Sequence, residues 1–222
     1  MGKLMRRAAI AILCALPCMT AQADEMSGFE FELDFSRDRI PLSDKTHLDA
    51  DGMGIRYRES TTLPLRLTLA LGREVVSHDD DPLSLGFQPD GYYAGITIGQ
   101  ASSPWHALQI GADLSYSYHS ATQQFNAQQL EIDWHRAEAR GWLALRLNNV
   151  TKLYGCAIAA NIDGTQTING STPSRIDFNN EQHTGYCGGI ELEAGNSGYI
   201  GIEVESRYQR GGRLYFGKRY GF

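Results

Sequence analysis

The residues best suited to chemistry lie together in one stretch of the chain. His119 is followed by Ser120, and Glu131, Asp133 and His135 come shortly afterwards. A serine beside a histidine, with an acid to orient the imidazole, is the set that a hydrolase uses to attack a carbonyl carbon. However, these residues match no hydrolase motif, and polar side chains are common in surface loops. A lipid- or peptide-hydrolysing enzyme is therefore an alternative hypothesis, and the sequence assigns no catalytic residue.

A second stretch offers ligands for a metal ion. Residues 78–81 read His-Asp-Asp-Asp, and carboxylate oxygens are the ligands that calcium prefers. The run lacks the spaced ligands and the glycine of a calcium loop, so a solvated acidic loop is the simpler interpretation. The chain also lacks a phosphate-binding loop, a dinucleotide fingerprint and zinc-ligand spacing. We expect no cofactor and no bound metal.

The first 23 residues have the three parts of a secretory signal peptide. A basic start is followed by an apolar stretch, and the small-residue exit Ala21-Gln22-Ala23 predicts cleavage after Ala23. The apolar stretch is shorter than the ~20 residues that a spanning helix needs. A lipid anchor on Cys18 is the other interpretation, but Pro17 stands where a small residue is wanted. Residues 24–222 are then the mature domain.

The charge of the mature chain excludes nucleic acid as a partner. The leader carries three of the 20 basic residues and none of the 26 acidic ones, so 17 minus 26 leaves a net charge of −9. A nucleic-acid-binding domain has the opposite balance. Cys156 and Cys187 remain after cleavage, and an exported compartment permits a disulfide. Strand alternation places Cys156 outward and Cys187 inward, which argues against the bond unless a bulge reverses one of them.

Apolar residues alternate with polar or small ones along most of the chain. Leu65, Leu67, Leu69 and Leu71, for example, alternate with arginine, threonine, alanine and glycine. A period of two is typical of a strand with one apolar face, and helical periodicity is almost absent. The chain is therefore expected to be all-β.

Two all-β architectures fit such alternation, a soluble sandwich and a membrane barrel. In a sandwich the apolar face fills a core, where large residues usually alternate with small ones. Here the apolar faces of several strands are uniformly large, and the other faces carry glycine, small residues and charges of both signs. A membrane barrel needs this combination, because lipid lies outside and a narrow polar lumen lies inside. The sequence favours the barrel.

The connections support the same architecture. Short ones are expected near residues 60–63, 101–104, 148–151 and 194–198, and long polar ones near 39–46, 74–90, 120–136 and 164–182. Short turns at one end and long loops at the other are typical of outer-membrane barrels. We predict a closed antiparallel up-and-down transmembrane β-barrel of about ten strands, with eight as the alternative. The expected strands are 28–38, 47–59, 64–74, 91–100, 105–119, 137–147, 152–163, 183–193, 198–208 and 212–222.

One stretch conflicts with this alternation. Leu130, Ile132 and Trp134 are apolar at even positions, whereas Leu143 and Leu145 are apolar at odd ones. A bulge between residues 137 and 141 would reconcile the two sets. Alternatively, residues 128–135 would be a separate strand that extends above the membrane.

The inward faces are expected to carry charges of both signs. Buried charges must be paired or hydrated, so they either fill the lumen as ion pairs or line a narrow pore. The sequence does not separate these two roles, and a passive, porin-like channel stays an alternative. The predicted lumen charges are Glu30, Glu32, Arg56, Arg66, Arg146, Glu191, Glu203, Glu205 and Arg219.

The last strand carries the most specific pattern. Leu214, Phe216, Tyr220 and Phe222 alternate up to the final residue, and Lys218 interrupts the series. With the alternation of the whole mature chain, this resembles the small outer-membrane β-barrel proteins of Gram-negative bacteria, such as OmpA and OmpX. That resemblance implies that the four residues form a C-terminal assembly signal, read by the barrel-assembly machinery after delivery by periplasmic chaperones. It also implies an outer-membrane location and outer-membrane lipids as partners.

From these observations we expect a non-enzymatic integral outer-membrane protein. Its role would be structural, surface-binding or that of a narrow pore.

Overall fold

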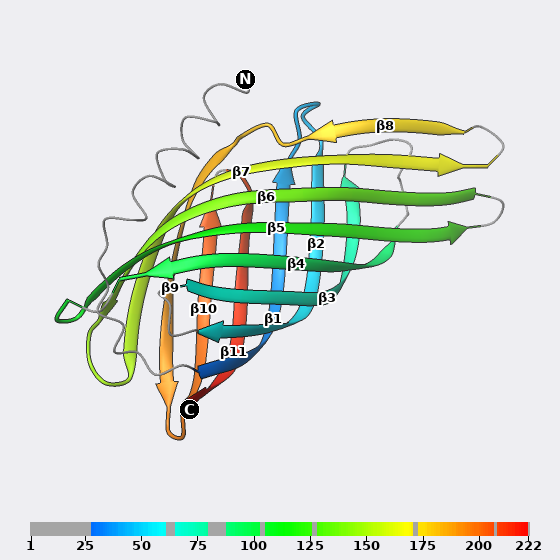
Figure 1. Ribbon diagram of the computed structural model, residues 1–222. Coiled ribbons are helices and arrows are strands. Elements are labelled where there is room, and N and C mark those ends of the chain that lie inside the picture. The colour runs from blue at the N-terminus through cyan, green and yellow to red at the C-terminus, as the bar shows by residue number, and fades with distance from the viewer. Residues whose placement is uncertain are drawn as a thin grey trace.

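The computed structural model describes residues 28–60, 65–79, 88–102, 105–125, 128–170, 173–206 and 208–221. These residues form one sheet of eleven strands (Figure 1). The predicted leader and Phe222 lie outside the described residues. No helix in the described ranges is long and apolar enough to cross a membrane. The strands are β1 (Gly28–Pro41), β2 (His47–Ser60), β3 (Leu65–Asp79), β4 (Asp90–Ala101), β5 (Leu108–Phe125), β6 (Gln128–Arg146), β7 (Thr151–Asn169), β8 (Ser174–Asn179), β9 (Thr184–Ala194), β10 (Gly198–Ser206) and β11 (Arg210–Gly221).

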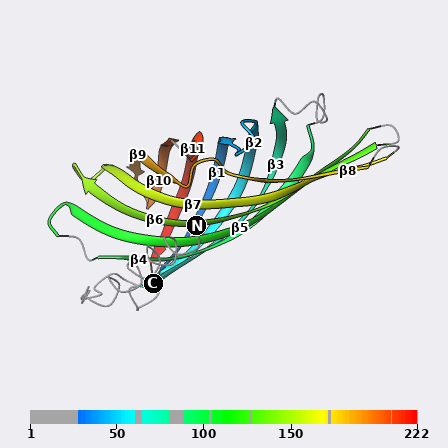
Figure 2. The same cartoon turned by 90° about the horizontal axis from the view of Figure 1, so that it is seen from above.

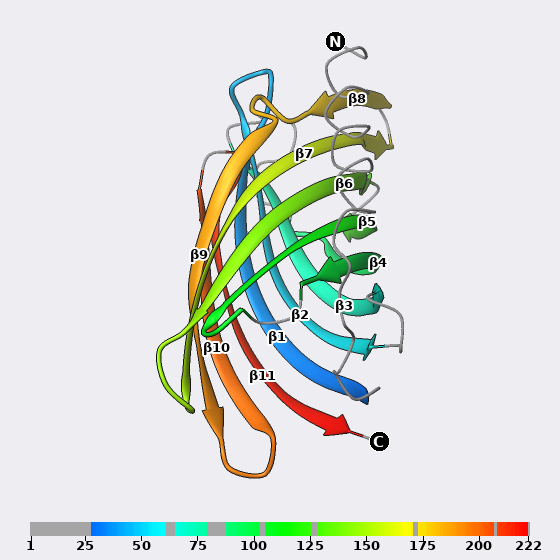
Figure 3. The same ribbon diagram turned by 60° about the vertical axis from the view of Figure 1, so that its left-hand side comes forward.

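The sheet closes on itself, which confirms the predicted antiparallel barrel. β1 pairs with β11 from Gly28 opposite Gly221 to Arg39 opposite Arg210, and β6 pairs with β7 along most of their length. Figure 3 follows the curved wall from β9 through β7, β6 and β5. Closure leaves the ring without an open edge, and among the described strands only β8 pairs along one side alone, with β7.

Strands β8 and β9 together occupy one place in the ring. The upper part of β7 pairs with β8, and its lower part pairs with β9. The barrel therefore has the ten strands that the sequence predicts, plus the extra strand β8, and the eight-stranded alternative is wrong.

A bulge separates β8 from β9. Three residues of β7, 160–162, lie opposite four residues, 180–183. The Asn180 side chain bridges the gap: its Oδ1 accepts from the Ile162 N–H at 3.0 Å, and its Nδ2 donates to the carbonyls of Ala160 and Gln182 at 3.3 and 2.6 Å. The extra residue reverses the alternation, so inward residues are even-numbered in β8 and odd-numbered in β9.

The disulfide that the sequence argued against is present. Cys156 lies on the lumen side of β7, directly opposite Cys187 of β9, with 4.9 Å between their Cα atoms, and the two form a disulfide. The sequence-based assignment of Cys156 to the outward face was wrong, because even-numbered residues of β7 face inward.

Two of the predicted long loops are mostly strand. β5 ends at Phe125 and β6 begins at Gln128, so the stretch 120–136 continues as a paired hairpin. The stretch 164–182 likewise contains the end of β7 and all of β8. In two views the ends of β5, β6, β7 and β8 run on together beyond the other strands (Figures 1 and 2).

The conflict in alternation along β6 has a different cause from either one predicted. The pairing of β6 with β5 and β7 runs without a bulge, and residues 128–135 belong to the same strand as the rest of β6. Leu130, Ile132 and Trp134 face inward and are buried, whereas Leu143 and Leu145 face outward and are exposed. The geometry of β6 is the same along its length, but the face that carries apolar residues changes. In the lower part the outward face is apolar, and in the upper part the inward face is apolar.

The same inversion occurs on β1. Its lower half presents Phe31 and Phe35 outward and Glu32 inward, but above them Arg39 is outward and Ile40 is inward and fully buried. The lower outward side chains remain highly exposed, as with Ile55 at 58% and Leu71 at 65%. An exposed apolar belt of this kind suits a surface surrounded by lipid hydrocarbon. A polar exterior over an apolar interior suits a surface surrounded by water.

The inverted upper part contains the hydrophobic core. Trp134, Leu48, Val76 and Tyr208 lie in it with no exposed surface. They come from strands on opposite sides of the ring, so this core fills the upper end of the lumen.

We expect Asn180→Ala to destabilise the barrel by about 2–3 kcal/mol, because it removes three hydrogen bonds and leaves buried backbone groups without partners. Urea unfolding in lipid vesicles, followed by tryptophan fluorescence, would measure the change. Asn179→Ala is the matched control, since the neighbouring side chain is exposed, and its effect should be below about 0.5 kcal/mol. Equal effects of the two variants would contradict this role for Asn180.

Candidate functional site

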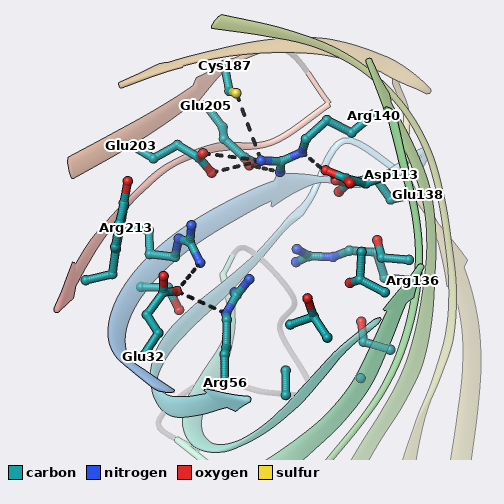
Figure 4. A pocket seen from close by; sticks show the side chains of 18 of the residues that line it. Glu32, Arg56, Asp113, Arg136, Glu138, Arg140, Cys187, Glu203, Glu205 and Arg213 are labelled. Carbon is teal, nitrogen blue, oxygen red and sulfur yellow. Dashed lines mark hydrogen bonds and ion pairs between the residues drawn. The ribbon is translucent and has the colours of Figure 1, made fainter. Parts of the chain in front are cut away.

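The lumen below the hydrophobic core is lined with paired charges (Figure 4). The nine predicted lumen charges all lie on inward-facing positions of their strands. Alternation alone locates them, because each strand keeps the same parity from its lower end to the core. What the sequence does not show is which charges meet across the lumen.

Arg140 of β6 is the centre of the upper network. Its guanidinium donates to Glu203 and Glu205 of β10 at 3.1 and 2.7 Å, and its Nε donates to Glu138 at 3.1 Å. Figure 4 shows these carboxylates gathered round Arg140, with the Cys187 sulfur close by. Tyr208 also donates to Glu138 at 2.8 Å and to Glu205 at 3.1 Å, so the carboxylates round Arg140 are held by a shared network of hydrogen bonds.

A second network joins β1, β2 and β11. Arg213 donates to Glu32 Oε1 at 2.9 Å, and Arg56 Nε lies 3.8 Å from the same oxygen (Figure 4). Arg56 also donates to Asp34 at 3.4 Å. Because β1 lies between β2 and β11, these pairs connect the strands that close the ring.

The lower end of the lumen is organised by Arg219. It donates to Glu30 at 3.3 Å, to Glu191 at 2.6 Å and to Glu193 at 3.2 Å. Arg146, the most exposed of the nine predicted charges at the side chain, also pairs with Glu193 at 3.2 Å.

Arg66 connects the charges of the lower lumen to β5. It lies 3.6 Å from Asp113 of β5 and stacks 5.1 Å above the Trp142 ring.

One ion pair crosses the full width of the lumen. Arg136 of β6 donates to Asp38 of β1 at 3.3 Å. The two strands lie five places apart in either direction round the ten-stranded ring, so the pair joins opposite walls. The pair lies immediately below the hydrophobic core. Asp38 is two residues from Ile40, and Arg136 is two residues from Trp134, and both of these apolar residues belong to the core.

Tyrosines fill much of the remaining space by lying over glycines of neighbouring strands. A side chain at Gly54 or Gly72 would collide with the Tyr93 ring, with a Cβ only 1.9 and 2.4 Å from its nearest atoms. Tyr215 covers Gly201 in the same way. The glycines of the inward faces therefore make room for rings, and a cavity of about 290 Å³ is left between the rings and the charged side chains.

The residues that the sequence grouped as a possible hydrolase are divided between two faces. Ser120, Asp133 and His135 share the outward face of β5 and β6, where Ser120 is directly opposite Asp133, whereas His119 faces the lumen. Asp133 accepts from the Tyr118 hydroxyl at 3.0 Å, and His135 Nδ1 lies 2.6 Å from the Tyr116 hydroxyl.

His119 has other polar partners. Its Nε2 lies 2.9 Å from Ser117 Oγ, and its Nδ1 lies 3.0 Å from Glu74. Sequence reasoning missed both partners. Ser117 shares a face with His119 because residues two apart on a strand do, and Glu74 was placed at the start of a loop although it belongs to β3.

The predicted assembly signal lies on the outside of the last strand. Phe216 and Tyr220 are both 40% exposed, and Leu214 lies on the same face. Lys218, which breaks the apolar series, places its ammonium 5.2 Å from the centre of the Tyr220 ring. Phe222 is outside the described residues, so its part in the signal stays a prediction.

In the described ranges, no three His, Cys, Asp or Glu side chains come together as metal ligands. Of the acidic run at 78–81, Asp80 and Asp81 lie outside those ranges.

Solved structures resemble the fold, although no protein-family description and no curated protein sequence matches the chain. The translocator domain of the autotransporter NalP from Neisseria meningitidis has a TM-score of 0.54 at 9% identity, covering 98% of this chain and 96% of that one. The β domain of the Bordetella autotransporter BrkA gives 0.51 at 10% identity, over 89% and 100%. An outer membrane channel from Pseudomonas putida F1 gives 0.50 at 10% identity, over 90% and 98%.

At these identities the comparison concerns the fold and not the role, and the three proteins include two autotransporter domains and one channel. Together with the closed ring, the exposed apolar belt and the charged lumen, it identifies the chain as an outer-membrane-type β-barrel.

Proposed function

We propose that this protein is an integral outer-membrane barrel with a closed lumen, which acts through the sheet that it holds outside the bilayer. The exposed apolar belt supports a membrane location, since water would not stabilise so many uncovered large side chains. The closed ring supports it too, because a spanning sheet in lipid must have no unpaired edge.

The observation that carries the proposal is the obstruction at the upper end of the lumen. The Arg136–Asp38 pair joins opposite walls, and the hydrophobic core lies directly above it. A conducting pore needs a hydrated path from end to end, and a dry apolar core interrupts such a path. A filled lumen is thus favoured over the porin-like alternative.

The outer sheet is the part of the barrel best placed to meet a partner. β6 and β7 are each 19 residues long, about twice the ~9–11 residues that cross a bilayer. Their upper halves pair with the end of β5 and with β8, so the projecting part is a continuous hydrogen-bonded sheet. Its outward face carries Glu131, Asp133, Asp163 and Asp177 and one arginine, Arg175, which pairs with Asp177 at 3.4 Å, and the remaining negative charge favours a partner with a positive surface.

We expect the refolded protein to give no reproducible single-channel steps in planar lipid bilayers. A variant that removes two large core side chains, Trp134→Ala with Ile162→Ala, should conduct intermittently and would show that the assay detects an opened barrel. Heat-dependent migration on gels would confirm that both proteins are folded. Regular steps from the unaltered protein would instead favour a narrow pore lined by charge.

The outer sheet should be accessible from outside intact cells. A cysteine introduced at Asn169, at the exposed tip of β7, should react with a membrane-impermeant maleimide added to whole cells. Asn149→Cys, at the exposed turn before β7, is the control and should react only after the outer membrane is broken. Cys156 and Cys187 are joined, so the background should be low. The opposite labelling order would reverse the orientation and overturn the proposal.

A further inference from the structure

A serine, a histidine and a glutamate form a hydrogen-bonded chain on the lumen wall. Ser117 Oγ lies 2.9 Å from His119 Nε2, and Glu74 oxygens lie 3.0 and 3.1 Å from His119 Nδ1. A nucleophile, a base on one ring nitrogen and an acid on the other are the components of a serine hydrolase site.

The hydrogen bonds fix the roles of the two ring nitrogens. An ionised glutamate has oxygens that only accept, so Nδ1 of a neutral His119 carries the proton and donates it to Glu74. Nε2 then has a free lone pair that accepts from the Ser117 hydroxyl. This is the tautomer in which the imidazole can take the serine proton.

The His119 ring is held in place on both faces. Trp134 of β6 stacks on it with ring centres 4.5 Å apart and an angle of 14°, and Tyr93 of β4 stacks on it at 5.5 Å and 23°. Both residues are its direct partners on the adjoining strands. A base clamped in this way keeps its distance to Ser117 without rearrangement.

Glu74 reaches His119 across an intervening strand. β4 lies between β3 and β5, and the residue of β4 opposite Glu74 is Gly91. A Cβ at Gly91 would lie 2.3 Å from the Ser120 carbonyl oxygen and 2.6 Å from Ala121 Cβ. The absence of a side chain there leaves the lumen wall open for the contact.

A cation lies beside the serine. Arg136 is the direct partner of Ser117 on β6, and paired residues on one face have Cβ atoms about 4.5–5.5 Å apart. Its Nη2 is used by Asp38, but its Nε is buried and has no hydrogen-bond partner among the described residues. An uncommitted N–H next to a nucleophile is suited to bind the oxyanion that forms during attack.

From this geometry we propose that the lumen contains an esterase site in which Ser117 is the nucleophile, His119 the general base and Glu74 the positioning residue. Ser117 Oγ bonds to the ester carbon as its proton passes to His119 Nε2, and the carbonyl electron pair moves to the oxygen beside Arg136. The carbon–oxygen bond of the leaving alcohol then breaks, and His119 returns the proton to that alcohol. Water attacks the acyl-serine by the same route and releases the acid.

The size of the cavity limits the substrate. Ser117, His119 and Glu74 line the space of about 290 Å³, together with Thr97 and Ser115. Pockets for drug-sized ligands measure roughly 300–1,000 Å³, so the site suits a small ester with a short acyl chain. A lumen closed to ion flow can still admit such a molecule, because a cavity needs an opening at one end only, whereas a pore needs openings at both ends.

The first test is covalent. The folded protein in detergent is treated with a small alkyl fluorophosphonate, which forms an Oγ–phosphorus bond as fluoride leaves and the serine proton passes to the base. Peptide mass spectrometry should find the adduct at Ser117 in the unaltered protein and at no residue in Ser117→Ala. Heat-denatured protein should not react.

The second test is kinetic, with p-nitrophenyl acetate as the substrate. His119→Gln should lower kcat by about 100-fold or more, the range of a general base, and Glu74→Gln should lower kcat with KM little changed. Ser120→Ala is the control, since this serine lies next to His119 in sequence but on the outward face of β5, away from the cavity. It should retain full activity.

Heat-dependent gel migration would show that each variant is folded. If a His119 or Glu74 variant fails to fold, the proposal is still tested in the unaltered protein, by comparing the amount of fluorophosphonate adduct at Ser117 with the amount at Ser115. No adduct at Ser117 of the folded protein would overturn the proposal, as would equal labelling at Ser115 or activity that survives Ser117→Ala. Loss of this activity would leave the closed-lumen proposal intact, because conductance and surface labelling are measured separately.

Discussion

The pairing of β1 with β11 is the interaction on which the rest of the molecule depends. It closes the ring, and so it gives every residue of ten strands a fixed side. At the lower end of this seam the Phe29 and Tyr220 rings stack with centres 4.9 Å apart. Inside it, Arg213 and Arg56 reach Glu32 from the two neighbours of β1. The seam is thus held from both faces, by aromatic contact outside and by charge inside.

Once the side that each residue faces is fixed, the surrounding medium, lipid or water, determines which residue types each face carries. The lower part of each strand meets an apolar medium outside and charges within, and the upper part is arranged as in a water-soluble sheet, with its dry side inward. Both halves use the same backbone. The change between the two halves requires no bulge in β6. The apolar residues move from the odd-numbered, outward positions to the even-numbered, inward positions.

This explains what the sequence predicts well and what it hides. Alternation locates strands and their inward charges, because each strand needs only a period of two. It misled at residues 130–134, where apolar residues on the opposite parity suggested a bulge, although the surroundings had changed. It also gave Cys156 the wrong side. The real bulge at Asn180 has no glycine to mark it, and the partners of His119 depend on register between strands, which one sequence does not contain.

The height of the apolar belt has a further consequence for the membrane itself. On β1 the outward apolar residues run from Phe29 to Phe35, which is about 20 Å along a strand at ~3.3 Å per residue. A tilt of roughly 40° reduces this to about 15 Å of vertical height, well below the ~25 Å band of such barrels. On β5 the run from Leu108 to Tyr118 is longer, about 33 Å along the strand. The barrel therefore presents a hydrophobic mismatch on one side, and lipid beside β1 must thin to cover its polar rim.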